Sequence, residues 1–261
     1  MKYFESDGIR LAYRVDGPED APALVMLNSL GTDMRMWNPQ VPWLGHELRL
    51  VRYDCRGHGA SDAPEGPYTI EQLGRDLLSL LDTLQIQRAH ICGLSLGGMI
   101  AQWFAANYPE RVDRVVFANT GARIGTVESW NIRINAVKAD GMPAIRDMVL
   151  ARFLGAGFRK QHPEVVQWVG EMLESINPAG YIGACAAVRD ADLHDLLPQI
   201  HAPSLVIGGE LDESTPPSLV RELHAALNGS ELIIFDEVAH LSNIEQPEAF
   251  TKAVLTFLAR T

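Results

Sequence analysis

Short apolar runs alternate along the chain with longer segments in which apolar residues recur every three or four positions. We expect strands at residues 2–6, 10–16, 23–28, 49–54, 112–119, 204–208 and 231–235. Continuous apolar runs such as 23–28 are typical of strands that are covered on both faces. Helical spacing between the runs, as at Leu73, Leu77 and Leu80, predicts crossover helices. This alternation predicts an α/β fold with a mostly parallel, doubly wound sheet.

The alternation breaks between about Gly121 and Leu197, where helical periodicity continues without a convincing strand pattern. Separate apolar faces begin near Trp130, Met148 and Val165. A single crossover connection rarely needs so many residues. We therefore expect a core made of residues 1–121 and 198–261, with residues 122–197 forming a helical cap over the sheet.

A further apolar run leads directly into a helical pattern, and Gly93-x-Ser95-x-Gly97 stands between them. This is the nucleophile-elbow pattern. The turn strains the backbone at the serine, and side chains two residues before and after it would collide, so both positions hold glycine. The helix that follows directs its first amides towards charge that forms beside Ser95. A phosphate loop is not expected, because no lysine follows the glycines.

A serine hydroxyl is a poor nucleophile at neutral pH and needs a base, which in turn needs an orienting acid. Of the eight histidines, only His240 follows the last expected strand in a short loop. Asp212 follows the preceding strand, with Glu210 and Asp236 as rival carboxylates. Another place for the acid, after the strand at 112–119, holds Asn119 and so offers no carboxylate. We expect Ser95, Asp212 and His240 to form a catalytic triad, in an order known for such triads.

The oxyanion that forms during acyl transfer needs two backbone donors. One should be the amide of Leu96, which directly follows the nucleophile. The other should come from the loop after the strand at 23–28, where position favours Leu30.

The segment Asp54-Cys55-Arg56-Gly57-His58-Gly59 contains side chains that are able to bind metals. We interpret it as structural instead, a glycine-rich strand exit held by hydrogen bonds of Asp54 and Arg56. A metal site is not expected there.

The net charge of −11, from 22 basic and 33 acidic residues, disfavours nucleic acid and anionic membrane surfaces as partners. An anionic substrate would be repelled at long range, so it would need a specific cation in its pocket. Cys55, Cys92 and Cys185 are odd in number and lack metal-ligand spacing, which predicts reduced thiols in the cytoplasm. We expect neither a signal peptide nor a membrane span.

Taken together, these residues resemble the α/β-hydrolase superfamily, and more closely the 3-oxoadipate enol-lactone hydrolases. The segments that carry the closer resemblance are Ser29–Asp33 with Met36-Trp37, Gly66–Ile70, Gly93–Met99, Asn119–Gly125, Glu128–Trp130 with Arg133, and Ala239–Pro247. The stretches 119–125 and 128–133 are the more diagnostic, because they lead into the expected cap, where the substrate is selected. Asn28 departs from the pattern, since many superfamily members carry histidine there.

The resemblance implies hydrolysis of a small anionic enol-lactone to 3-oxoadipate in the β-ketoadipate pathway of aromatic catabolism. It implies no metal and no cofactor. The substrate carboxylate would meet Arg133 beside Trp130, with Arg123 and Arg189 as alternatives. A fork of two hydrogen bonds is the usual geometry of such a pair.

Two alternatives stay open. A small-ester carboxylesterase or a carbon–carbon bond hydrolase would use the same triad on another substrate. More distantly, the same scaffold serves small-ligand receptors. The oligomeric state is not predicted.

Overall fold

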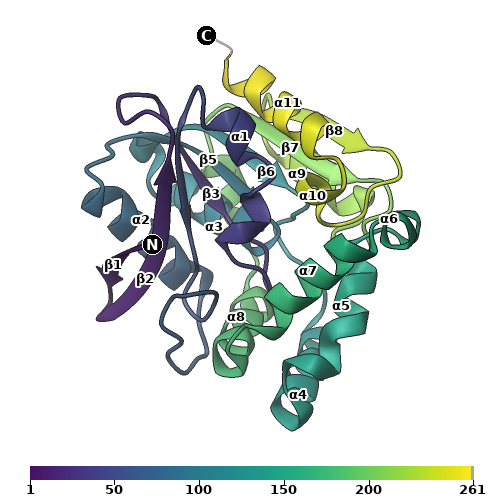
Figure 1. Cartoon of the computed structure of the whole chain (residues 1–261). Helices are drawn as coiled ribbons and strands as arrows, with labels where there is room; N and C mark the ends of the chain where they lie inside the picture. Colours follow the sequence, from purple (N-terminus) through teal and green to yellow (C-terminus); the bar gives the residue numbers. More distant parts are fainter. Residues whose placement is uncertain (260–261) are drawn as a thin grey trace.

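The computed structural model describes residues 1–259 and contains one sheet in the order β1-β2-β4-β3-β5-β6-β7-β8 (Figure 1). The strands are β1 (Lys2–Ser6), β2 (Ile9–Asp16), β3 (Ala23–Leu27), β4 (Arg49–Tyr53), β5 (Ala89–Leu94), β6 (Val112–Ala118), β7 (Ser204–Gly209) and β8 (Glu231–Phe235). β2 pairs antiparallel with β1 and β4, and all other neighbours are parallel. The predicted mostly parallel α/β sheet is confirmed.

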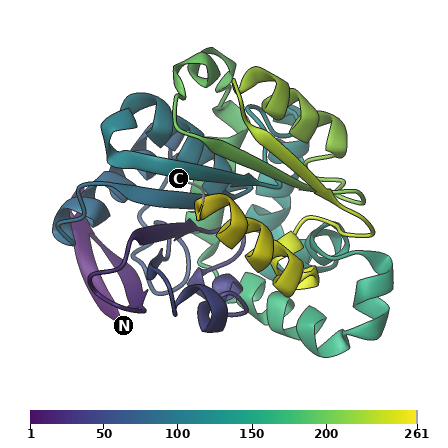
Figure 2. The ribbon, with the colours of Figure 1, turned by 90° about the horizontal axis from the view of Figure 1, so that it is seen from above.

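Helices cover both faces of this sheet, as the view from above shows (Figure 2). The α-helices are α1 (Val41–Leu44), α2 (Ile70–Thr83), α3 (Leu96–Asn107), α4 (Val127–Asp140), α5 (Arg146–Phe153), α6 (Ala156–Gln161), α7 (Pro163–Glu174), α8 (Pro178–Asp190), α9 (Pro217–Ala226), α10 (Ser242–Glu245) and α11 (Pro247–Leu258). Short 3-10 helices are η1 (Met34–Trp37), η2 (Pro109–Arg111), η3 (Met142–Ile145) and η4 (His194–Gln199). Within residues 1–259, no helix is long and apolar enough to cross a membrane.

The core of the sheet follows directly from the apolar runs. Every residue of β3 is buried, as expected for a strand covered on both faces. α2 begins at the N-cap Thr69, whose side chain accepts a hydrogen bond from the Gln72 amide, and buries Leu73, Leu77 and Leu80. The strands therefore hold their carboxyl ends, where the functional loops start, in fixed positions.

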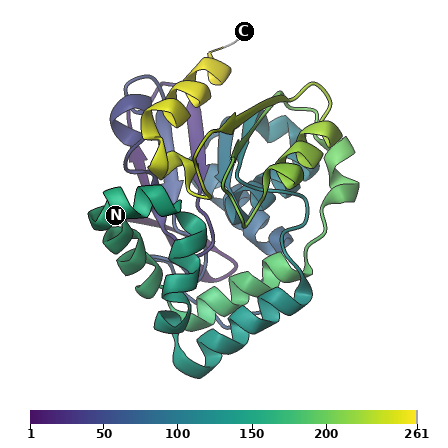
Figure 3. The same cartoon turned by 90° about the vertical axis from the view of Figure 1, so that its right-hand side faces the viewer.

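Between β6 and β7 the described chain is helical, and α4 to α8 gather at one end of the sheet (Figures 1 and 3). We call α4 to α8 the cap helices. α4 packs against α8, and α5 packs against α7. The division into a core of residues 1–121 and 198–261 and a cap of residues 122–197 stays a prediction, and residues 260 and 261 lie outside the described range.

α8 contacts the core at two backbone-to-backbone approaches. A Cβ atom added to Gly57 would lie 2.5 Å from the Cα of Gly180, and one added to Gly66 would lie 2.6 Å from the Cα of Gly183. The amide of Tyr68 also donates to the carbonyl of Gly183 at 3.1 Å. Glycine at these positions lets α8 rest directly on the core loops.

Candidate active site

Ser95 occupies the sharp turn between β5 and α3. Its backbone lies at φ 57° and ψ −113°, a strained conformation for a residue with a side chain. A Cβ atom on Gly93 would lie 2.2 Å from the carbonyl oxygen of Gly97, and one on Gly97 would lie 2.2 Å from that of Leu27. The predicted need for glycine at both positions is confirmed.

His240 lies in the loop after β8, and Asp212 lies in the loop after β7. The Nδ1 atom of His240 is 2.8 Å from Oδ2 of Asp212, and both side chains are buried. Since an ionised carboxylate only accepts hydrogen bonds, this contact places the proton of a neutral imidazole on Nδ1. The structure thus brings together two of the three residues that the sequence analysis assigned to a triad.

Five hydrogen-bond donors surround the Asp212 carboxylate. Oδ2 accepts hydrogen bonds from His240, from the Thr215 hydroxyl at 2.6 Å and from the Asn119 side-chain amide at 3.0 Å. Oδ1 accepts from the amides of Ser214 at 2.8 Å and Thr215 at 2.9 Å. Burial raises the pKa of Asp212, but the attraction of His240 and these hydrogen bonds outweigh burial and lower it overall. Asp212 is therefore an ionised partner for the imidazole.

The Phe153 ring of the cap helices stacks on His240, with centroids 5.6 Å apart and planes 23° apart. The Leu241 amide donates to the Phe153 carbonyl at 2.9 Å. Glu245 makes a second connection, because its carboxylate accepts from the amides of Ala239 at 2.8 Å and Gly155 at 3.0 Å. The histidine loop is thus attached to the cap helices on both sides of His240.

The loop between β3 and η1 contains the amide that the sequence analysis expects to be the second oxyanion donor. Three backbone amides of this loop have partners. Ser29 donates to the Met36 sulfur, Gly31 donates to the His58 ring, and Thr32 donates to the Ser29 carbonyl. The Leu30 amide is the remaining donor of this stretch, and Leu30 lines the same cavity as Ser95. Leu96 is the first residue of α3, so its amide lies outside the intrahelical hydrogen bonds.

Asn28, the position that departs from the family pattern, has a structural role. Its side-chain amide donates to the Tyr53 carbonyl at 2.8 Å, and its Oδ1 accepts from the Trp37 indole at 3.0 Å. Its own carbonyl accepts from the Gly97 amide at 3.0 Å. Asn28 thereby attaches the loop before Leu30 to the start of α3.

A cavity of about 240 Å³ lies between the sheet and the cap helices. It is lined by Ser29, Leu30, Ser95, Ile124, Gly125, Ser129, Trp130, Ile132, Arg133, Met148, Arg152, Phe153, Ser214 and His240. Five of the predicted site residues are among them: the nucleophile, the base, Leu30, and the two predicted substrate contacts Trp130 and Arg133. Asp212 lies behind His240.

Of the three candidate arginines, the structure brings only Arg133 to this cavity. Its guanidinium lies 4.8 Å from the centroid of the Trp130 ring. Arg123 pairs with Asp192, and Arg189 pairs with Asp190, and neither arginine lines the cavity.

Sequence reasoning missed Arg152, Phe153 and Glu245 as parts of the site. Phe153 belongs to the apolar face that begins near Met148, and Arg152 precedes it in the sequence. Periodicity identifies the buried side of a helix but not what that side covers. The one available signal for Arg152 was its spacing of four residues from Met148, which puts both on one side of α5.

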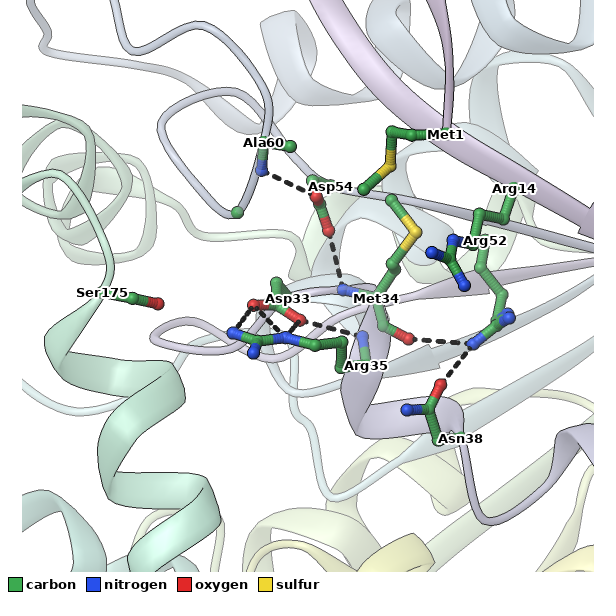
Figure 4. Close-up of a pocket in the computed structure, with 11 residues that line it drawn as sticks. Met1, Arg14, Asp33, Met34, Arg35, Asn38, Arg52, Asp54, Ala60 and Ser175 are labelled. Atoms are coloured by element: carbon green, nitrogen blue, oxygen red, sulfur yellow. Dashed lines mark hydrogen bonds and ion pairs between the residues drawn. The ribbon is translucent and has the colours of Figure 1, made fainter.

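A larger cavity, about 450 Å³, lies elsewhere and contains none of the predicted site residues (Figure 4). Two of its charged side chains are engaged with each other, since Asp33 forms an ion pair with Arg35 at 2.6 Å. Asp54 accepts hydrogen bonds from the amides of Met34 at 2.7 Å and Ala60 at 2.9 Å. The predicted hydrogen bonds of Asp54 and Arg56 are confirmed, because Arg56 also binds Asp76 with two hydrogen bonds.

Residues 24–253 match the model of the alpha/beta hydrolase family. The chain is 39% identical to 3-oxoadipate enol-lactonase 2 of Acinetobacter baylyi over 252 residues, which cover 97% of this chain and 94% of that protein. The enol-lactonase structure from Burkholderia xenovorans LB400 has a TM-score of 0.97 and 43% identity, covering 99% of this chain and 100% of that one. A hydrolase structure from Pseudomonas aeruginosa gives a TM-score of 0.96 at 43% identity, with coverages of 99% and 98%. These similarities extend over the sheet and the cap helices alike.

Proposed function

The chain belongs to the α/β hydrolase family, and we propose that it is a serine hydrolase that opens 3-oxoadipate enol-lactone to 3-oxoadipate. The observation that carries the proposal is the composition of one cavity. Ser95 and His240 lie there beside Arg133 and Arg152, which have no acidic partner within residues 1–259. A small substrate with one carboxylate matches both the chemistry and the charge of this cavity.

In the first half of the reaction, Ser95 attacks the carbonyl carbon of the lactone. The Nδ1 atom of His240 is engaged by Asp212, so Nε2 accepts the serine proton. The amides of Leu30 and Leu96 stabilise the oxyanion of the tetrahedral intermediate. Asp212 stabilises the imidazolium and holds the ring in orientation.

The ring carbon–oxygen bond then breaks, which leaves an acyl-enzyme and an enolate oxygen on the same molecule. His240 donates its proton to this oxygen, and the enol tautomerises to the ketone. Water, deprotonated by His240, attacks the ester carbonyl, and Ser95 recovers the proton as 3-oxoadipate leaves. An enolate is a better leaving group than an alkoxide, which favours this substrate over simple alkyl esters.

The substrate carboxylate binds Arg133, which stacking on Trp130 holds in place. This contact provides the specific cation that a chain of net charge −11 requires for an anionic ligand. The three buried free cysteines agree with a reducing compartment, and we place the reaction in the cytoplasm.

The test compares the purified enzyme on 3-oxoadipate enol-lactone, p-nitrophenyl acetate and a dienoic ring-fission acid. We expect kcat/KM to be at least ~100-fold higher for the enol-lactone, and Ser95→Ala to abolish turnover of all substrates. A higher kcat/KM on the neutral ester would assign a carboxylesterase instead. Cleavage of the dienoic acid alone would assign a carbon–carbon bond hydrolase.

A further inference from the structure

The segment from Asp54 to Ala60 lies directly behind the loop that carries Leu30. We define the oxyanion loop as residues 28–33. The Gly31 amide donates a hydrogen bond to Nε2 of His58 at 3.2 Å. At the end of the loop, the Met34 amide donates to Asp54 at 2.7 Å, and Figure 4 shows this carboxylate between Met34 and Ala60. Two side chains of one segment therefore hold the oxyanion loop from behind.

The partners of His58 fix the position of its proton. A backbone amide only donates, so Nε2 must accept from Gly31 with its lone pair. Nδ1 lies 3.2 Å from the carbonyl oxygen of Arg56, which only accepts, so Nδ1 carries the hydrogen. Burial lowers the pKa of His58 to about 4, so the ring is neutral near pH 7 and able to make both contacts.

The support behind His58 is rigid. Arg56, two residues before His58, makes two hydrogen bonds to Asp76 of α2, at 2.7 and 2.6 Å. Both side chains are buried. Gly57, directly before His58, lies against the backbone of Gly180 in α8. The imidazole therefore cannot shift without disturbing both the core and α8.

The oxyanion loop is fixed on both sides of Leu30. The carbonyl of Ser29 accepts from the Thr32 amide at 3.2 Å and from the Thr32 hydroxyl at 2.8 Å. In a trans peptide the N–H points opposite to the C=O, so these bonds turn the Leu30 amide away from Thr32. His58 holds the next peptide, at Gly31. Together these contacts fix the orientation of the Leu30 amide.

We propose that His58 is a positioning residue for the oxyanion hole, which as a neutral acceptor holds Gly31 so that the Leu30 amide points at the reacting oxygen. This inference rests on the proposed function in taking Leu30 as an oxyanion donor. Its effect lies in the transition state, because the substrate carbonyl carries little charge before attack. Loss of His58 should therefore lower kcat and leave KM nearly unchanged.

Two substitutions separate the acceptor from the ring. His58→Phe keeps an aromatic ring of similar size but has no acceptor. His58→Gln keeps an oxygen acceptor at about the position of Nε2. Thr32→Val removes the hydrogen bond from the Thr32 hydroxyl to the Ser29 carbonyl with little change of shape. His224→Phe is the matched control, since His224 bonds Ser230 at 2.7 Å and does not line the cavity.

The measurements are kcat and KM on p-nitrophenyl acetate and on the enol-lactone, and the dissociation constants of phenylboronic acid and 3-oxoadipate. Phenylboronic acid forms a tetrahedral adduct with the serine, so its affinity reports on the oxyanion hole. For His58→Phe we expect about a 10- to 100-fold lower kcat on both substrates, a KM within about twofold of the wild type, and weaker boronate binding. His58→Gln should retain most of the wild-type kcat, and the kcat of Thr32→Val should fall less than that of His58→Phe. The control His224→Phe should match the wild type.

The inference is overturned if folded His58→Phe keeps a wild-type kcat. It is also overturned if boronate and 3-oxoadipate affinities fall equally, which would indicate general damage to the cavity. If His58→Phe fails to fold, His58→Gln and Thr32→Val decide the question. The measure is then how far their affinity for the boronate falls relative to their affinity for 3-oxoadipate. If the wild type hydrolyses only the ester and His58→Phe slows it, the proposed substrate is wrong while the positioning role holds.

Discussion

Arg133 and Arg152 keep their positive charges available to a ligand. The guanidinium of Arg133 stacks on Trp130 and lies 3.7 Å from the sulfur of Met148. Arg152 follows Met148 by four residues in α5, so both arginines border the same methionine. Stacking on an indole holds a guanidinium in place without neutralising it, unlike the ion pair that engages Arg123.

Truncation of these arginines should act on charged substrates alone. We expect Arg133→Ala to raise KM for the enol-lactone about 10- to 100-fold, and Arg152→Ala to raise it less, because a charge-assisted hydrogen bond is lost. KM for p-nitrophenyl acetate should change less than about twofold. Arg123→Ala is the control, since its side chain is exposed and outside the cavity. Equal effects of Arg133→Ala on both substrates would remove Arg133 from carboxylate binding.

Single residues were predictable where the chain marks them by position. Each triad residue follows, directly or within a few positions, a strand that is recognisable in the sequence as an apolar run. These residues are Ser95, Asp212 and His240. Arg152 was not predictable, because its place in the cavity depends on how α5 packs over the sheet. The alternative acid position, Asn119, proved to be a partner of Asp212, a contact between loops that no local pattern encodes.

Among the elements, α10 has a role out of proportion to its four residues. Its last residue, Glu245, accepts one amide from the histidine loop and one from the segment after α5. Burial raises the pKa of this carboxyl, which reflects the limited access of water to it. A single side chain thus links the loop that carries the base to the cap helices, beside the contacts of Phe153.

Glu245→Gln should disturb this junction without removing volume. The glutamine replaces one acceptor oxygen by an NH₂ group, which would face an amide that also donates. We expect a loss of about 1–3 kcal/mol in stability and about a 5- to 20-fold lower kcat, with a higher KM for the enol-lactone. Glu248→Gln, on the exposed side of α11, is the control in chemical denaturation and steady-state kinetics. Lower stability with wild-type kinetics would show that Glu245 only supports the fold.

Strands were more predictable than cap helices for a physical reason. A strand buried on both faces is apolar throughout, so the predicted run 23–28 extends only one residue beyond β3. The predicted run 231–235 matches the half-buried edge strand β8. The cap helices bury narrower stripes and end at residues with ordinary preferences. The periodicity showed three apolar faces where the structure has the five helices α4 to α8, and it showed neither their bounds nor their contacts with His240.

For the molecule as a whole, acid acts in opposite directions on two buried groups. Burial lowers the pKa of His58 from 6.5 to about 4, so the unfolded state takes up this proton first and stability falls as pH falls below 6.5. Burial raises the pKa of Asp54 from 3.8 to about 6, so the folded state takes up this proton first and stability rises as pH falls through 6. The two contributions partly cancel between pH 7 and pH 5.

Variants that remove one group at a time should reveal the cancellation. When the pH falls from 7 to 5, the unfolding free energy of Asp54→Asn should decrease by about 1 kcal/mol more than that of the wild type. The unfolding free energy of His58→Gln should decrease by about 2 kcal/mol less than that of the wild type. Urea denaturation at both pH values measures these differences. The same pH dependence in all three proteins would contradict the opposed protonation of the two groups.

The glycine contacts of α8 bear on attempts to redesign this enzyme. A Cβ atom on Gly180 would lie 2.3 Å from the Cα of Gly57, and one on Gly183 would lie 2.8 Å from the Tyr68 ring, so a side chain at either position would push the helix away from its support. A chimaera that borrows substrate preference from a relative should therefore exchange α4 through α7 and retain the native α8. The safest splice point lies in the few residues between α7 and α8.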